Sequence, residues 1–383
     1  MNRMTSTLEQ SSPVRSSYST GWPSVLFAVA VAAAATYAFS HRPPPPFAPT
    51  QVQPDRIQIN GVVRAGTRLV AVGELGRILI SEDGKAWTEA KVEKPRGSTL
   101  TQVLATDGAV LAVGHDGWIL RSEDQGQTWK EVQFTAEGDP LLGIAGPYDG
   151  KLYAYGSFGL FLSSADGGKT WTKSTLAEEG AAPAADTAAA EAAAAPAEAA
   201  APAEEDPWAD PFANVGKGDE GIGDRHLNGM TRAADGSLWL VGERGLLLQS
   251  KDQGATWKDH PGVYAGSFFG VLSLPSRGLL VYGMRGNAYY STDSGQTWTR
   301  SKIPEALSLF SGAVTAQNEV VLVGASNAVF VSRDGGIGFT RMSPVNQKSL
   351  TAVLPLASGD IVLAGEGGVE LGGLNAQPKG DTP

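Results

Sequence analysis

A repeat of 41 or 42 residues constrains the fold of this chain more than any other feature of its sequence. Six segments follow the pattern Ser-x-Asp-x-Gly-x-Thr-Trp, or a close variant of it, and end in an aromatic residue. These residues are Trp87, Trp129, Trp171, Trp257, Trp298 and Phe339, at intervals of 42, 42, 86, 41 and 41 residues. A period near 42 made of short strands is typical of β-propeller blades.

Each copy of the pattern, an Asp box, follows two apolar segments joined by a Gly-containing turn, as in LVAVGELGRILIS at residues 69–81. A seventh copy of these segments starts at Asp360 and has no box after it. The sequence therefore predicts an all-β, seven-bladed propeller of four-stranded blades, with the strands of each blade called A to D from the inside outward. The last blade lacks its outer strand. Because a propeller must protect its strand edges, we expect residues 48–53 (APTQVQ) to supply that strand and close the ring.

The Asp boxes are predicted to be structural. An Asp in a tight turn accepts hydrogen bonds from backbone N–H groups, and the aromatic ring can pack between adjacent blades. A catalytic site is one asymmetric arrangement of different groups, so a set repeated around a ring indicates architecture. The box carboxylates are Asp83, Asp124, Asp166, Asp252, Asp293 and Asp334.

The N-terminal part of the chain carries a targeting signal. A polar tail (residues 1–21) precedes an uncharged segment (22–40) that is about long enough to span a bilayer, and a Pro-rich spacer (41–54) follows it. The segment is either an uncleaved transmembrane anchor or a cleaved signal peptide. We therefore expect the propeller on the periplasmic side of the cell membrane, or secreted if the signal is cleaved.

An acidic Ala/Pro-rich insert (residues 176–224) divides blades 1–3 (55–175) from blades 4–7 (225–372), and a tail (373–383) ends the chain. The composition of the insert predicts disorder. It is either a tolerated surface loop or a recognition segment that uses Trp208 and Phe212. Because the insert holds twelve acidic residues and one basic residue, the remainder of the chain is close to neutral. No basic stripe for nucleic acid is predicted.

The turns between strands B and C carry candidate contacts for a partner. They include Arg77, Arg244 and Arg285, and arginine is favoured at interfaces. The alternative is ordinary solvated turn charge. Since B–C turns and blade-to-blade links lie on one face of a propeller, the insert is expected on that face as well.

Enzymatic chemistry is not expected. The chain has no cysteine, its four histidines are scattered, and it has no phosphate-binding loop. We predict no cofactor, no metal site and no small-molecule substrate. The rival hypothesis is a divergent sialidase-like glycoside hydrolase or a glycan-binding protein. The Arg-Ile-Pro type of motif that opens sialidases is missing from this sequence.

The repeated unit V-x-V-G-x-x-G-x-I-x-x-S-x-D-x-G-x-T-W, behind an export signal, resembles the photosystem II stability/assembly factor family of Asp-box (BNR) repeat propellers. The resemblance covers residues 55–372 apart from the insert. It implies a non-enzymatic scaffold for a membrane protein or complex subunit. The chain lacks the lipid-accepting cysteine of cyanobacterial members and carries the acidic insert. Both departures favour the non-photosynthetic bacterial branch, for which the resemblance also suggests an RND-type transporter as partner.

Overall fold

The structure is a computed structural model that describes residues 21–39, 56–177, 222–275, 278–342 and 348–373. It contains two separate units, residues 1–51 and 52–383. The first unit holds one helix, α1 (Trp22–Phe39), formed by the uncharged segment. Among the described residues, no helix combines the length and the apolar character needed to cross a membrane.

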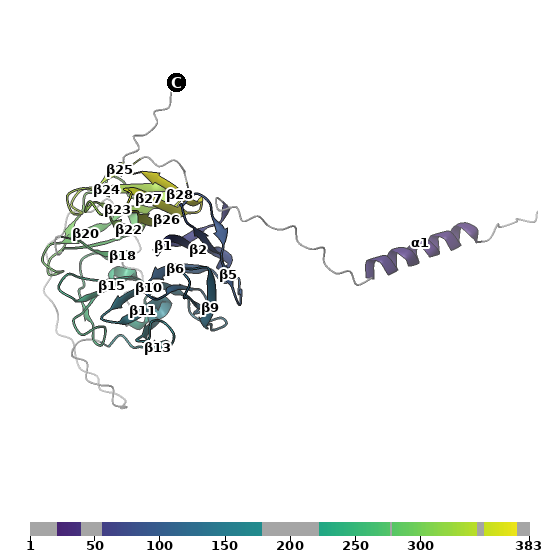
Figure 1. Ribbon diagram of the computed structural model, residues 1–383, viewed down its shortest axis with the longest axis horizontal. Helices are drawn as coiled ribbons and strands as arrows, with labels where there is room; N and C mark the ends of the chain where they lie inside the picture. The colour runs from purple at the N-terminus through teal and green to yellow at the C-terminus, as the bar shows by residue number, and fades with distance from the viewer. Residues whose placement is uncertain (1–20, 40–55, 178–221, 276–277, 343–347, 374–383) are drawn as a thin grey trace, which may run out of the picture. The chain divides into compact units, whose positions relative to one another are not determined.

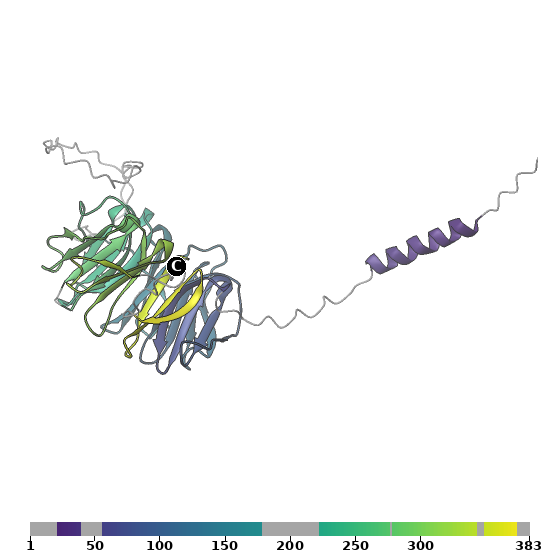
Figure 2. The ribbon, with the colours of Figure 1, turned by 90° about the horizontal axis from the view of Figure 1, so that it is seen from above.

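The second unit is a seven-bladed β-propeller, as the repeat predicts (Figure 1). Seen at 90° to that view, the blades stand side by side (Figure 2). Six blades have four antiparallel strands in the order A–B–C–D, and the described part of the seventh has three. The strands of blades 1 to 4 are β1 (Ile59–Ala65), β2 (Arg68–Gly73), β3 (Ile78–Ser81), β4 (Thr88–Glu89); β6 (Leu100–Ala105), β7 (Val110–Gly114), β8 (Ile119–Ser122), β9 (Thr128–Gln133); β10 (Leu141–Tyr148), β11 (Lys151–Gly156), β12 (Phe161–Ser164), β13 (Thr172–Lys173); β14 (Leu227–Arg232), β15 (Leu238–Gly242), β16 (Leu247–Ser250), β17 (Lys258–Asp259). Those of blades 5 to 7 are β18 (Phe268–Ser273), β19 (Leu279–Gly283), β20 (Ala288–Ser291), β21 (Thr299–Arg300); β22 (Leu309–Val314), β23 (Val320–Gly324), β24 (Ala328–Ser332), β25 (Thr340–Met342); β26 (Leu350–Pro355), β27 (Asp360–Gly365), β28 (Gly368–Gly373).

The B strands explain why the apolar runs in the sequence are continuous rather than alternating. Each blade packs against a neighbour on both faces, and β7, β15, β19 and β23 are buried at every position. Seven apolar clusters fill the seven contacts between neighbouring blades. The core is thus a ring of interfaces between blades.

The ring closes between blades 7 and 1. Ile59 and Ala71 of blade 1 form one cluster with Ala352 and Ala364 of blade 7. The hydroxyl of Thr351 donates a hydrogen bond to the Ile59 carbonyl oxygen. Residues 48–53, which were expected to supply the missing strand, lie outside the described residues, so that part of the closure stays a prediction.

The links between blades fix which face each turn occupies. The link after blade 1 forms a short strand, β5 (Lys91–Val92), which pairs in parallel with β9 of blade 2. Because the strands alternate in direction, the B–C turns and the links share one face, here called the B–C face, and the Asp boxes lie on the other. The chain enters the insert after β13 and leaves it through a short 3-10 turn (Ile222–Asp224) before β14, so the two described ends of this link lie on the B–C face. Trp208 and Phe212 lie outside the described residues.

Candidate binding face

The Asp boxes form closed hydrogen-bond networks on the face opposite the B–C turns. In blade 3, the Ser164 hydroxyl donates to Asp166 Oδ1 at 2.8 Å and accepts from the Gly168 N–H at 2.9 Å. The backbone N–H and hydroxyl of Thr170 donate to the two carboxylate oxygens of Asp166 at 3.0 and 2.6 Å. The blade 6 box has Gly338 in the Thr position, and its N–H alone reaches both oxygens of Asp334.

These hydrogen bonds favour the ionised carboxylate. The bonds from the Thr170 side chain and backbone lower the pKa of Asp166 well below its usual value. The equivalent bonds from Thr297 lower the pKa of Asp293 to about 2. A general acid near neutral pH needs a raised pKa, so the boxes serve the fold and offer no acid.

The box tryptophans fill the spaces between blades. Trp129 and Trp257 are 0 % exposed. Trp129 lies in the cluster between blades 1 and 2, and its indole N–H donates to the Gly126 carbonyl at 2.8 Å. The Trp257 ring packs edge-on against Phe161 of blade 3, with centroids 5.8 Å apart.

The B–C face presents one recurring turn. In six blades, two consecutive residues at the tip have a positive φ, which defines the type I′ turn of tight hairpins. The first of the two residues is Leu75, Asp116, Phe158, Arg244, Arg285 or Ser326. This position favours Asn, Asp or Gly, because other side chains are strained in the left-handed region.

Leu75 and Phe158 stand out within this set, and the sequence analysis did not identify them. Their φ values are 55° and 51°, and they are 65 % and 61 % exposed. Phe158 packs only against the edge of His226 among the described ring contacts, at 5.0 Å between centroids. Blades 1 and 3 therefore each hold a large apolar side chain away from the core in a strained conformation.

The three predicted arginines occupy two different positions on this face. Arg244 and Arg285 take the strained turn position in the adjacent blades 4 and 5. Arg77 follows the turn of blade 1, three blades away, and its Nη1 lies 2.8 Å from both carboxylate oxygens of Glu89. The structure does not bring the three together into one cluster.

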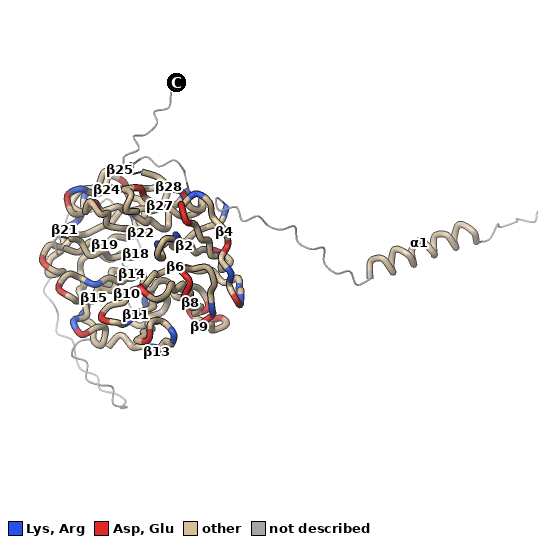
Figure 3. The backbone as a smooth tube through the Cα atoms, in the orientation of Figure 1, with Lys and Arg blue, Asp and Glu red and all other residues tan. Residues whose placement is uncertain are grey.

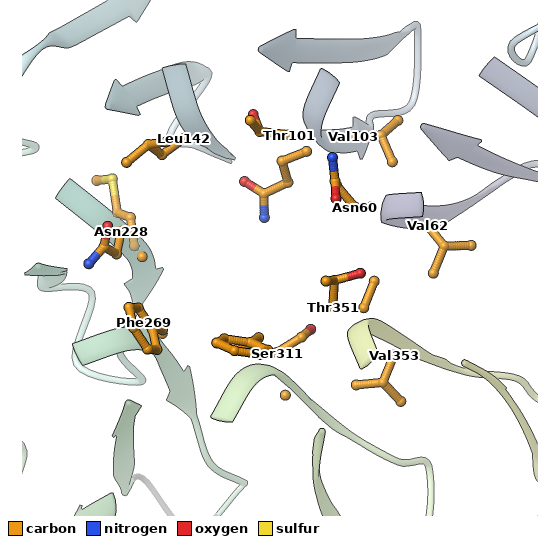
Figure 4. Close-up of a pocket in the computed structure, with 18 of the residues that line it drawn as sticks. Asn60, Val62, Thr101, Val103, Leu142, Asn228, Phe269, Ser311, Thr351 and Val353 are labelled. Carbon is orange, nitrogen blue, oxygen red and sulfur yellow. The ribbon is translucent and has the colours of Figure 1, made fainter. Parts of the chain in front are cut away.

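The central channel, shown in close-up in Figure 4, opens on the same face, because Glu74 and His115 of the B–C turns belong to its lining. It is a cavity of about 860 Å³ lined by the inner strands of all seven blades. The inner strands β6, β18 and β22 carry no charged residue, and the arginines of β1 and β14, Arg64 and Arg232, are not among the residues that line the cavity. Figure 3 shows charge mainly toward the outside of the ring. Burial raises the pKa values of the lining tyrosines Tyr155 and Tyr282, so both stay neutral.

The described lining of the cavity has no pair of carboxyl groups. Most glycoside hydrolases use two of them about 5–10 Å apart, although sialidases use a tyrosine nucleophile. Glu74 is the one carboxylate among the described residues that line this cavity. In the described part of the chain, no three potential metal ligands gather either.

Comparisons with known proteins support the fold. The profile of the DUF6242 beta propeller domain matches residues 58–193, which is less than half of the chain. Among curated proteins, none matches this sequence. The chain shares its fold with solved structures at low sequence identity. This likeness shows the β-propeller fold alone.

Three solved structures illustrate that architecture. YCF48 from Cyanidioschyzon merolae has a TM-score of 0.59 at 15 % identity, over 84 % of this chain and 96 % of its own. YCF48 bound to D1 peptide has a TM-score of 0.58 at 16 % identity, over 83 % and 92 %. Streptogramin B lyase has a TM-score of 0.61 at 13 % identity, over 83 % and 94 %. The architecture thus occurs both in a peptide-bound protein and in an enzyme.

Proposed function

We propose that this chain is a non-enzymatic scaffold whose B–C face binds another protein. The observation that carries the proposal is the exposure of Leu75 and Phe158 in left-handed turns. Neither side chain contributes much to the core, and each occupies a position that Asn or Gly would fill without strain. Strained residues are kept where the surrounding structure and a function require them.

The chemistry of the face fits a protein partner. Arg244 and Arg285 share the turn position of the two apolar residues. Arginine and aromatic side chains such as phenylalanine are enriched at protein interfaces. A rigid ring presents them without loss of backbone freedom on binding, which favours affinity. The fold of the D1 peptide-bound YCF48 is similar. That likeness supports a peptide segment as the kind of ligand, and the family resemblance of the repeat implies that it belongs to a membrane protein.

We propose further that the propeller works outside the cytoplasm. The support is the order of a polar tail, an uncharged helix and a Pro-rich spacer in the sequence. A reporter enzyme that is active only outside the cytoplasm, fused after Asn60, is expected to be active. Recovery of the intact chain from the cytoplasm would contradict export, and N-terminal sequencing separates an anchor from a cleaved signal.

Crosslinking and pull-down from native membranes test the binding face. The wild-type chain should recover a membrane protein, and the double variant Leu75→Asn/Phe158→Asn should lose it. The double variant Arg244→Glu/Arg285→Glu should weaken recovery, while Arg77→Glu should have less effect because Arg77 lies outside the left-handed turn position and three blades away. Lys251→Glu, in the blade 4 Asp box on the opposite face, is the matched control. Equal recovery with all variants would refute the face assignment.

A glycan-hydrolysis screen tests the enzymatic alternative. Since the cavity offers a single carboxylate, Glu74, no turnover is expected. Turnover that disappears in Glu74→Gln would replace the scaffold proposal with an enzymatic one.

A further inference from the structure

The inner strands contain a position that repeats in all seven blades. Each A strand begins with a buried apolar residue that pairs with the last Gly of the B strand, as Ile59 pairs with Gly73 and Leu350 with Gly365. The residue after it lies at the channel mouth. In blades 1 to 7 this residue is Asn60, Thr101, Leu142, Asn228, Phe269, Phe310 and Thr351.

In four blades this residue joins one blade to the next. Asn60 Nδ2 donates to the Leu100 carbonyl at 2.8 Å, and Thr101 Oγ1 donates to the Leu141 carbonyl at 2.8 Å. Asn228 Nδ2 donates to the Phe268 carbonyl at 2.8 Å, and Thr351 makes the equivalent bond that closes the ring. The acceptor is always the first residue of the next A strand. The structural role of the position is therefore a hydrogen bond between blades.

Leu142, Phe269 and Phe310 depart from this role, because their side chains have no donor. Phe269 and Phe310 belong to adjacent blades, and their ring centroids lie 5.7 Å apart. Phe310 remains 37 % exposed. Apolar side chains at these sites give up a hydrogen bond between blades and remain partly in contact with water. Such a loss of stability at a repeated position points to a ligand.

The surroundings define the chemistry of that ligand. Leu142 and Phe269 lie on one side of the cavity with Asn228 between them, and Asn60 lies on the other side (Figure 4). Met230 and Phe310 also line the cavity and add to its apolar surface. The volume of about 860 Å³ is in the range of sites that enclose a ligand group. With little charge on its lining, the cavity favours an uncharged group with an aromatic or aliphatic body.

We propose that the channel mouth binds an uncharged, aromatic or large aliphatic side chain of a peptide segment from the docked partner. A peptide is favoured over a free small molecule because the mouth opens between the B–C turns. A protein bound to that face would cover the mouth and could extend a segment into it. The inference rests on the function proposed for the B–C face.

Methyl NMR of the methionines provides a direct test. The chain has five methionines: Met230 lines the cavity, Met284 lies on the B–C turn of blade 5, and Met342 is on an outer strand. The full-length chain, labelled with ¹³C-methyl methionine, is titrated with capped Gly-Ser-X-Ser-Gly peptides in which X is Trp, Leu, Ser, Glu or Lys. The Trp and Leu peptides should shift the Met230 signal and leave Met342 unchanged, and the other three should bind more weakly.

Phe269→Thr/Phe310→Thr is the matching variant. It installs the residue that blades 2 and 7 use at this position, so folding should be preserved or improved. Loss of the aromatic contact should weaken the Trp peptide about tenfold or more. Val331→Ala, which removes apolar contacts between blades 6 and 7 outside the cavity lining, should destabilise the fold and bind the Trp peptide as before.

The outcomes separate this inference from the function of the face. If the pull-down recovers a partner but no peptide shifts the Met230 signal, the docking function of the face stands and the proposed pocket is overturned. A Met230 shift by free indole but not by the Trp peptide overturns the peptide proposal in favour of a small-molecule site. Equal binding by wild type and Phe269→Thr/Phe310→Thr also overturns it. A pocket that binds the Trp peptide, together with failure to recover any protein, counts against the docking function alone.

Discussion

Replacing Leu75 by Asn should stabilise the protein while removing part of its binding face. Leu75 has φ 55° and ψ 22°, a conformation that Asn tolerates and a branched apolar residue does not. Relief of this strain is worth about 1–2 kcal/mol. The side chain is 65 % exposed, so only a third of it is removed from water, which amounts to about 0.5–1 kcal/mol lost on substitution. The free energy of unfolding should therefore rise by about 0.5–1 kcal/mol.

Leu75→Ala is the matched control. It removes the same apolar contacts but keeps a Cβ in the left-handed region, so it should lower the free energy of unfolding by about 0.5–1 kcal/mol. The difference between the two variants isolates the strain. Phe158→Asn should be close to neutral, because its contact with His226 offsets the relief by about 0.5–1.5 kcal/mol.

Urea unfolding followed by tryptophan fluorescence measures these differences. A change in midpoint at constant slope reports stability. If Leu75→Asn and Leu75→Ala are equally destabilising, the turn stores no strain. The inference that function holds Leu75 in place would then lose its basis.

Two further predictions concern the Asp boxes. Trp129→Ala should cost about 3–5 kcal/mol, because the ring is fully buried between blades; thermal melts test this, and an unchanged melting temperature with lost partner binding would contradict the structural role. The lowered pKa values of Asp166 and Asp293 stabilise the fold above the unfolded pKa near 4, and this stability should be lost as the pH falls toward about 2. Urea midpoints measured from pH 5 to pH 2 should therefore decrease, and less steeply in Asp293→Asn; parallel curves would refute the linkage.

The number of blades could be predicted from the sequence because two independent signals agree. The box period gives six units, and the apolar B strand reveals the seventh even without a box. That strand is recognisable because blades cover it on both sides. The bond from Thr351 to Ile59 could not be predicted, since it joins residues 292 apart and depends on the register of two inner strands.

The candidate site was only partly predictable. Arg77 was grouped with Arg244 by proximity to a turn, but the strings GELGR and GERGL show that the two residues differ in turn position. When the two strings are aligned, Leu75 takes the same position as Arg244, directly before the Gly of a type I′ turn. Reading the turns for backbone conformation as well as charge would have identified Leu75 and Phe158. Aligning the inner strands would have identified Phe269 and Phe310.

The departures from the repeat that cost stability lie on one face of the ring. The Asp-box face keeps the same Ser–Asp network in six blades, even where Gly338 replaces Thr. On the B–C face, the residue at the turn tip differs from blade to blade. The residue type at the channel mouth also differs between blades. In the fold, equivalent positions of the blades make the same structural contacts. A residue that departs from the repeat and lowers stability therefore indicates a function other than folding. Because this variation is concentrated where the turns and the channel meet, we infer a single partner that contacts both, rather than one ligand at the turns and another in the channel.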